Sequence, residues 1–173
     1  MVKKIPLIFN PSAHANKGSQ LADEIRKVST NIELIETKSF DHLKELVEGY
    51  VKDGIENICV AGGDGTINAV IDSILGTEIN LGVFPTGTMN LFAREMGLPL
   101  NNIKDCWNVI EKGKTKKIDI FKAGDSIFVQ VAGVGFDAKI IKETSWENKK
   151  KFGRFSYLLS AFNVASQKAP RIK

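Results

Sequence analysis

The sequence is poor in the residues that build disulfide frameworks and transition-metal sites. It has two cysteines and two histidines among 173 residues, and the cysteines do not form a CxxC motif. Neither pair has the short spacing at which zinc ligands usually stand. We therefore expect Cys59 and Cys106 to be reduced thiols in the core of a cytoplasmic protein, and we expect no transition-metal site.

Long apolar runs and several signature motifs are also missing. No run is long enough to cross a bilayer, and the apolar stretch after residue 4 is too short for a signal peptide. The sequence contains no P-loop motif (GxxxxGKS or GxxxxGKT) and no HRD or DFG motif. These absences exclude the P-loop nucleotide-binding proteins and the protein kinases.

The charge is weakly positive. A composition of 43% hydrophobic and 25% charged residues is that of an ordinary globular protein, and the net charge is +4. This charge suits a nucleotide or an anionic membrane surface, but it equally fits a protein with no specific anionic partner. It is too small to indicate nucleic-acid binding. We predict a cytoplasmic protein without a nucleic-acid partner, and contact with a membrane from the side is left open.

Short apolar stretches alternate with segments of helical spacing through residue 112. The stretches at 5–9, 32–37, 57–61 and 81–84 have the length of strands. Helical spacing follows Gly18, Asp41 and Ile67. Asp41 is expected to cap the second of these helices and Gly54 to end it. The alternation predicts an α/β domain with a Rossmann-like, mainly parallel sheet.

The pattern changes after residue 113. Residues 117–121 and 126–134 are predicted as consecutive strands around a turn at 123–125. We therefore expect an α/β domain at 1–115 and, at 116–173, the beginning of an incomplete, β-rich domain of the β-sandwich type. The basic run at 149–151 and the apolar stripe at 152–165 fit either a core helix or a helix on an anionic membrane, and the spacing favours the core.

A glycine-rich turn lies between the third strand and the next helix. Residues 62–68 read Gly-Gly-Asp-Gly-Thr-Ile-Asn. Glycine lets a ligand approach the backbone, and the helix N-terminus offers free N–H groups and a partial positive charge for phosphate. Asp64 would repel bare phosphate, so its presence indicates a nucleotide that carries a divalent cation. The alternative is a tight packing turn in which Asp64 or Thr66 caps the helix.

Polar turns follow three of the predicted strands, at residues 10–14, 62–68 and 86–90. Since ligands of parallel sheets bind beyond the carboxyl ends of the strands, we expect these turns to converge, with Thr37 on the same rim. Arg94 either reaches phosphate from the helix after Asn90 or lies on a solvated face. The GxGxxA pattern at 133–138 is not a dinucleotide fingerprint, because it lies in the β-rich segment without a ribose-binding acid downstream.

Four motifs together resemble one known family. They are Asn-Pro-Ser-Ala at 10–13, the glycine turn at 62–68, Pro-Thr-Gly-Thr-Met-Asn-Leu-Phe-Ala-Arg at 85–94 and Gly-Phe-Asp-Ala at 135–138. In this order they resemble the diacylglycerol kinase catalytic family, which includes bacterial lipid kinases and sphingosine kinases. The resemblance covers essentially the whole chain. The GGDGT motif alone is shared with NAD kinases and phosphofructokinases, and the motif at 85–94 makes the resemblance specific.

The resemblance implies phosphorylation of a lipid hydroxyl at a membrane surface, with ATP and Mg²⁺ as cofactors. The nucleotide contacts that it implies are Asn10, Pro11, Ser12, Ala13, His14, Thr37, Gly62, Gly63, Asp64, Gly65, Thr66, Ile67, Asn68 and Thr88. Asp64 is expected to organise Mg²⁺ indirectly, and Asn90 and Arg94 are the candidates for the substrate side. A homodimer is left open as the assembly.

Two departures from the family pattern concern His14, where glycine is common, and Leu91, where many diacylglycerol kinases have aspartate. Leu91 leaves the identity of the lipid open. The family's general base and metal carboxylates lie in a later β-sandwich, so they are expected beyond Lys173. The alternatives are a nucleotide-binding regulatory module without catalysis and an NAD kinase-like enzyme. The latter would need a downstream Asn-Glu pair in place of the Gly-Thr-Met-Asn turn.

Overall fold

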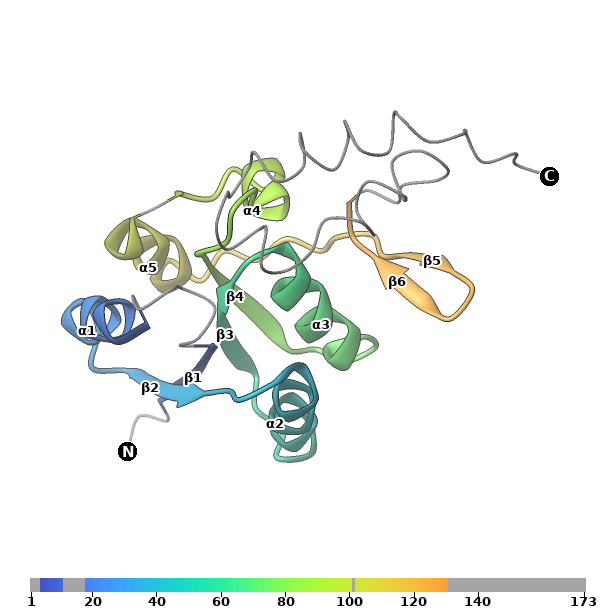
Figure 1. Ribbon diagram of the computed structural model, residues 1–173, viewed down its shortest axis with the longest axis horizontal. Coiled ribbons are helices and arrows are strands. Elements are labelled where there is room, and N and C mark those ends of the chain that lie inside the picture. Colours follow the sequence, from blue (N-terminus) through green and yellow to red (C-terminus); the bar gives the residue numbers. More distant parts are fainter. Residues whose placement is uncertain (1–3, 11–17, 101, 131–173) are drawn as a thin grey trace, which may run out of the picture. The chain divides into compact units, whose positions relative to one another are not determined.

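A four-stranded parallel sheet with helices on both faces forms the body of the protein. The computed structural model describes residues 4–10, 18–100 and 102–130. The elements, labelled in Figure 1, are β1 (Ile5–Phe9), α1 (Gly18–Val28), β2 (Ile32–Glu36), α2 (Phe40–Lys52), β3 (Asn57–Gly62), α3 (Asp64–Ile74), β4 (Asn80–Pro85), α4 (Leu91–Glu95), α5 (Ile103–Glu111), β5 (Phe121–Ala123) and β6 (Ser126–Phe128). The predicted Rossmann-like α/β fold is confirmed.

The strand order β2-β1-β3-β4 creates a reversal in the middle of the sheet. All three pairings are parallel, and Leu7 pairs with Cys59 between the two central strands. The chain leaves β1 towards β2 on one side, whereas it leaves β3 towards β4 on the other. The carboxyl ends of β1 and β3 therefore flank a topological switch point, the place where open α/β sheets bind their ligands.

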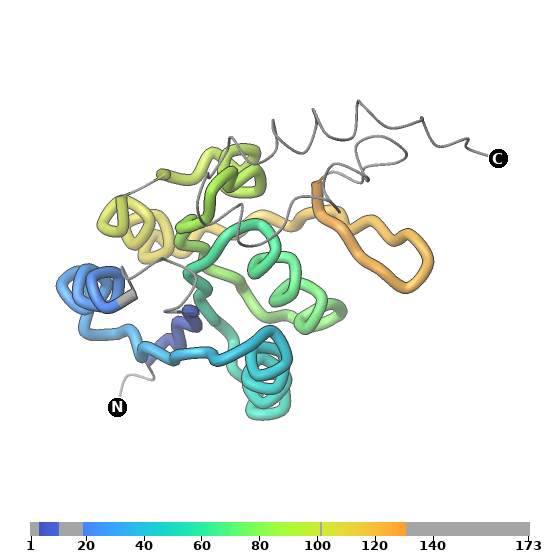
Figure 2. The backbone as a smooth tube through the Cα atoms, in the orientation of Figure 1, coloured from blue at the N-terminus to red at the C-terminus, as the bar shows by residue number. Residues whose placement is uncertain are grey.

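Alternate residues of the strands face two separate cores. Leu7 and Phe9 pack in one cluster with residues of α1 and α5, while Ile8 packs in the other with residues of α2 and α3. Figure 2 shows these two helix pairs on opposite sides of the sheet. Because both faces are covered, the central strands are apolar at nearly every position rather than alternating.

The N-cap of the second helix lies two residues before the predicted cap at Asp41. Ser39 is the N-cap of α2, and its hydroxyl accepts a hydrogen bond from the His42 N–H at 3.1 Å. Asp41 lies in the first turn, where a carboxylate interacts favourably with the helix dipole. The predicted stop is confirmed, since Gly54 follows the C-cap with φ of 63°.

The two cysteines are free and buried, as predicted. Burial raises the pKa of the Cys59 thiol to about 12 and that of Cys106 to about 11, where nearby Asp105 adds to the effect. A raised folded-state pKa favours the protonated thiol. The contribution of each protonated thiol to the free energy of unfolding is therefore complete below the ordinary pKa of 9.0. It is lost as the pH rises towards about 11 for Cys106 and about 12 for Cys59.

We predict that both thiols resist alkylation in the folded protein. Only the thiolate reacts, and the pKa lies about two units above the ordinary value for Cys106 and about three for Cys59. Iodoacetamide at pH 8 should therefore label each thiol of the native protein at least about 100-fold more slowly than in the urea-unfolded protein. Mass spectrometry of timed aliquots measures both rates. Native labelling as fast as labelling in urea would contradict the burial of these residues.

The predicted hairpin is present but shorter than expected. β5 and β6 pair antiparallel around a turn in which Gly124 has φ of 60°, and the rings of Phe121 and Phe128 stack with centroids 5.5 Å apart. Residues 117–120 are not in a strand. Ile118 and Ile120 instead pack against the cluster of α2 and α3.

The described residues up to Val129 belong to one compact unit. The domain division after residue 115 and the β-sandwich stay predictions. The basic run at 149–151, the helix at 152–165 and the motifs at 133–138 lie outside the described residues. Within the described ranges, no helix combines the length and the hydropathy that crossing a bilayer requires.

Candidate functional site

The first glycine turn joins β3 to α3 without a side-chain cap. Gly62 ends β3, and Gly63 is the N-cap of α3 with φ of −94° and ψ of −177°. Of the alternative, a tight packing turn capped by Asp64 or Thr66, the capping part is therefore wrong. Since the first N–H groups of a helix have no intrahelical partner and Gly63 has no side chain to accept them, the start of α3 offers donors to an external acceptor.

The second turn, between β4 and α4, touches the first one backbone to backbone. The Thr86 N–H donates to the Gly62 carbonyl at 3.0 Å, which extends the pairing of the two strands into the turns. A Cβ added to Gly87 would lie 2.4 Å from the Cα of Gly63. Position 87 therefore needs glycine because the two backbones approach closely, and a Cβ on Gly63 would be tight as well, at 3.1 Å from the Gly87 Cα.

Gly62 and Gly65 have different reasons to be glycine. A Cβ on Gly62 would lie 2.6 Å from the Cβ of Thr66, so internal packing requires the glycine there. Gly65 lies within the first turn of α3, it is exposed, and a Cβ there would meet nothing within 4 Å. No packing in the described part of the chain requires glycine at position 65, and the space in front of its N–H is open to a ligand.

Asn90 braces the second turn with its side chain. It is buried and left-handed, with φ of 49° and ψ of 48°. The Gly87 N–H donates to Asn90 Oδ1 at 2.8 Å, and Asn90 Nδ2 donates to the Gly87 carbonyl at 3.0 Å. Both polar atoms of the amide are thus used inside the turn. Any effect of Asn90 on the substrate side acts through the shape of this turn.

Asp64 connects the two turns. Its Oδ1 accepts a hydrogen bond from the Phe92 N–H at 3.0 Å, in the first turn of the short helix α4. The carboxylate therefore caps α4 from a different helix, and this hydrogen bond leaves Oδ2 for a cation or a water that the cation carries. The half-buried side chain of Asp64 holds the start of α4 beside the start of α3.

Of the other residues predicted as nucleotide or substrate contacts, some lie at the rim of the sheet and some in its interior. Asn10, half-buried, follows β1, and exposed Thr88 lies in the second turn. Thr37 is 3% exposed, and its hydroxyl donates to the Ser39 carbonyl at 2.9 Å, so this side chain ties the end of β2 to the start of α2. Exposed Arg94 donates from Nε to the Met89 carbonyl at 2.9 Å, which holds its guanidinium beside the second turn.

Two residues of the glycine motif point away from the rim. Ile67 is fully buried in the core shared with α2, and the Asn68 amide donates to the Ile127 carbonyl of β6 at 3.4 Å. The structure thus brings Gly62, Gly63, Asp64 and Gly65 together with the turn at 86–90. Pro11, Ser12, Ala13 and His14 lie outside the described residues.

Sequence reasoning missed two partners in this site. Gly87 was part of a recognised motif but was not predicted as the packing partner of Gly63, and the Phe92 N–H was not predicted as the donor to Asp64. For the Phe92 N–H the signal is the short helix after β4, because the N-terminal N–H groups of a helix require an acceptor from elsewhere in the chain.

The arrangement fits a phosphate ligand better than a free metal ion. Uncapped N–H groups and open space at Gly65 suit anionic oxygens. No group of three or more His, Cys, Asp or Glu side chains gathers as a metal site within the described residues. A magnesium ion here would therefore take Asp64 as its protein carboxylate and share the oxygens of a bound nucleotide, as Mg²⁺ commonly does.

Comparison with known proteins gives a consistent result. Residues 4–123 match the family model described as the diacylglycerol kinase catalytic domain. The chain is similar to a diacylglycerol kinase from Mycobacterium tuberculosis, with 30% identity over 73% of this chain and 42% of the relative. It is also similar to a diacylglycerol kinase from Staphylococcus aureus, with 28% identity over 96% of this chain and 55% of the relative.

The fold is similar to that of solved structures. The crystal structure of a diacylglycerol kinase from Bacillus anthracis matches with a TM-score of 0.67 and 27% identity, covering 91% of this chain and 53% of that chain. The chain thus spans about half the length of the relatives and structures that it matches.

Proposed function

Because the chain belongs to the diacylglycerol kinase catalytic-domain family, we propose that it carries the nucleotide-binding half of an ATP- and Mg²⁺-dependent lipid kinase. The observation that supports this most is the uncapped start of α3 at Gly63, with open space in front of Gly65. Phosphoryl transfer depends on positioning and on neutralising charge, and preorganised backbone donors serve both needs.

In this proposal, three groups of residues have separate roles. The N–H groups at the start of α3 bind phosphate oxygens, and the dipole of the helix favours their negative charge. Asp64 would hold Mg²⁺ through Oδ2, directly or through water, and the ion supplies positive charge against the phosphates. Asn90 and the Gly63–Gly87 contact keep the two turns in one fixed arrangement, so the donors need no reorganisation when the nucleotide arrives.

The acceptor in this proposal is a lipid hydroxyl presented at a membrane surface, with the protein peripheral to that membrane. Arg94 and Leu91 are the exposed side chains of α4 nearest the second turn, and Leu91 is 41% exposed. An apolar residue at this place favours contact with an acyl chain over a hydrogen bond to the acceptor. Which lipid is phosphorylated depends on residues of the acceptor half.

Transfer of labelled phosphate from ATP to diacylglycerol or to a long-chain base in mixed micelles tests the proposal. Transfer that requires Mg²⁺ supports the kinase. Nucleotide binding without transfer is the result expected both of the nucleotide-binding half on its own and of the second candidate, a regulatory nucleotide-binding module, because the chain spans about half the length of its relatives. Absence of both binding and transfer would contradict the proposal.

Two variants of Asp64 separate its charge from its hydrogen bond. Asp64→Asn keeps an oxygen that can accept from the Phe92 N–H, so the free energy of unfolding should change little, whereas Asp64→Ala should lower it by about 1 kcal/mol through the lost cap. Both should lose most of the gain in ATP affinity that Mg²⁺ provides, about tenfold, which equals roughly 1.4 kcal/mol.

Calorimetric titration with ATP, in Mg²⁺ and in EDTA, measures that gain, and urea unfolding measures the stability. An Asp64→Asn protein whose affinity still rises with Mg²⁺ as in the wild type would remove Asp64 from the cation site.

A further inference from the structure

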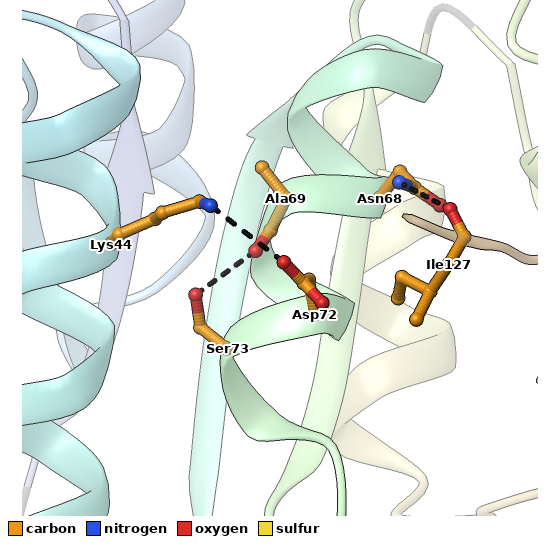
Figure 3. Close-up of polar contacts among 6 residues, drawn as sticks. All are labelled: Lys44, Asn68, Ala69, Asp72, Ser73 and Ile127. Atoms are coloured by element: carbon orange, nitrogen blue, oxygen red, sulfur yellow. Dashed lines mark hydrogen bonds and ion pairs between the residues drawn. The ribbon is translucent and has the colours of Figure 1, made fainter. Parts of the chain in front are cut away.

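Asn68 belongs to the glycine motif, yet its side chain faces the β5–β6 hairpin. Figure 3 shows its amide directed at the Ile127 carbonyl, and the distance between Nδ2 and that oxygen is 3.4 Å. Asn68 lies one turn after the start of α3, and it is half-buried. Asn68 therefore follows the glycine turn at the start of α3, and its side chain contacts the hairpin.

Apolar packing holds the hairpin region on α3 from the same direction. Ile127 and Val129, together with Ile118 and Ile120, pack against the cluster that contains Val70 of α3. Such packing is non-directional, so it brings the two surfaces together without fixing how they are aligned. A hydrogen bond is directional, so the one from Asn68, although long at 3.4 Å, can set this alignment.

The other side of α3 is held differently. Lys44 of α2 forms an ion pair with Asp72 at 3.7 Å, and both side chains are more than 40% exposed, so this contact contributes little. Ser73 donates to the Ala69 carbonyl within the same helix. Figure 3 shows the hydrogen bond from Asn68 to Ile127, which joins α3 to the hairpin in addition to the apolar packing.

We propose that Asn68 is a positioning residue that fixes the hairpin on α3 and makes no contact with the nucleotide. Asn68 aligns β6 with α3, the helix whose first turn binds the nucleotide phosphates in the proposed function. It thereby sets the position, relative to those phosphates, at which the chain leaves β6. The link to phosphate rests on the proposed function, whereas the docking of the hairpin does not.

Two variants test the proposal in the full chain. Asn68→Asp keeps the shape but has no N–H to donate, and Asn68→Gln keeps the amide donor on a longer stem. Loss of one hydrogen bond should speed amide hydrogen exchange in residues 121–129 roughly three- to tenfold in Asn68→Asp, and Asn68→Gln should restore much of the protection. The dissociation constant of Mg-ATP should stay within about twofold of wild type in both variants.

Lys44→Ala is the matched control, because it removes the contact on the other side of α3 and should leave exchange in 121–129 unchanged. Exchange is followed by mass spectrometry and affinity by calorimetry. A tenfold loss of Mg-ATP affinity in Asn68→Gln would make Asn68 a nucleotide ligand and overturn the proposal, and so would hairpin exchange that neither variant alters. If the wild type does not bind Mg-ATP, the proposed function fails, while the exchange data still decide the role in docking.

Discussion

Gly87→Ala is expected to destabilise the protein strongly. The added Cβ would lie 2.4 Å from the Cα of Gly63 and 2.7 Å from Asn90 Oδ1, and the first of these neighbours is backbone that cannot rotate away. Overpacking of this kind costs about 3 kcal/mol. In a domain of this size the loss corresponds to a fall in melting temperature of roughly 6–12 °C.

Thermal and urea unfolding, followed by circular dichroism, measure this effect. Gly65→Ala is the matched control, since the same substitution meets no atom within 4 Å there. Equal stability of the two variants would show that the two turns are not packed against each other. The substitution at Gly87 should also displace Asn90, so the variant that remains folded should bind Mg-ATP more weakly than wild type.

The second large effect is expected in Gly65→Ala itself, where stability and binding should change in opposite directions. Alanine is a better helix former than glycine, so the free energy of unfolding should stay the same or rise by up to about 1 kcal/mol. The new methyl group would occupy the open space through which a phosphate reaches the N–H groups of the first turn. Losing one charge-assisted hydrogen bond should weaken Mg-ATP binding at least about tenfold.

Calorimetry with Mg-ATP and urea unfolding of the same preparation provide both numbers. Gly49→Ala serves as the comparison, because it too meets no atom within 4 Å but lies in α2, away from the turns. If Gly65→Ala binds Mg-ATP as tightly as wild type, the phosphates do not approach this turn. A loss of affinity shared by Gly49→Ala would mean that the effect is not local.

The sheet and its helices could be predicted from the sequence because both faces of the sheet are buried. Strands such as β1 and β3 are apolar at successive positions, and Val70 and Ile71 mark the buried face of α3 at helical spacing. The polar turns that follow the strands then predicted the edge of the sheet at which the candidate site lies. These signals depend on a residue's immediate neighbours, which the sequence shows directly.

The contacts between the turns could not be predicted in the same way. Gly63 and Gly87 are far apart in sequence, and their approach depends on β3 pairing with β4. The cap of α2 was misplaced because Ser39 and Asp41 are both good capping residues, and only the backbone decides between them. Asn68 was assigned to the nucleotide by its motif, and only the position of β6 shows its contact with the hairpin.

The central claim is that nucleotide phosphates bind at the start of α3. An NMR titration of the isotope-labelled protein with Mg-ATP tests it most directly, with the amide of Gly113 as a remote reference on the turn after α5. The account predicts that the amide resonances of Gly63, Asp64 and Gly65 shift first and furthest, while that of Gly113 stays unchanged. Saturable binding that leaves those three amides unmoved would contradict it.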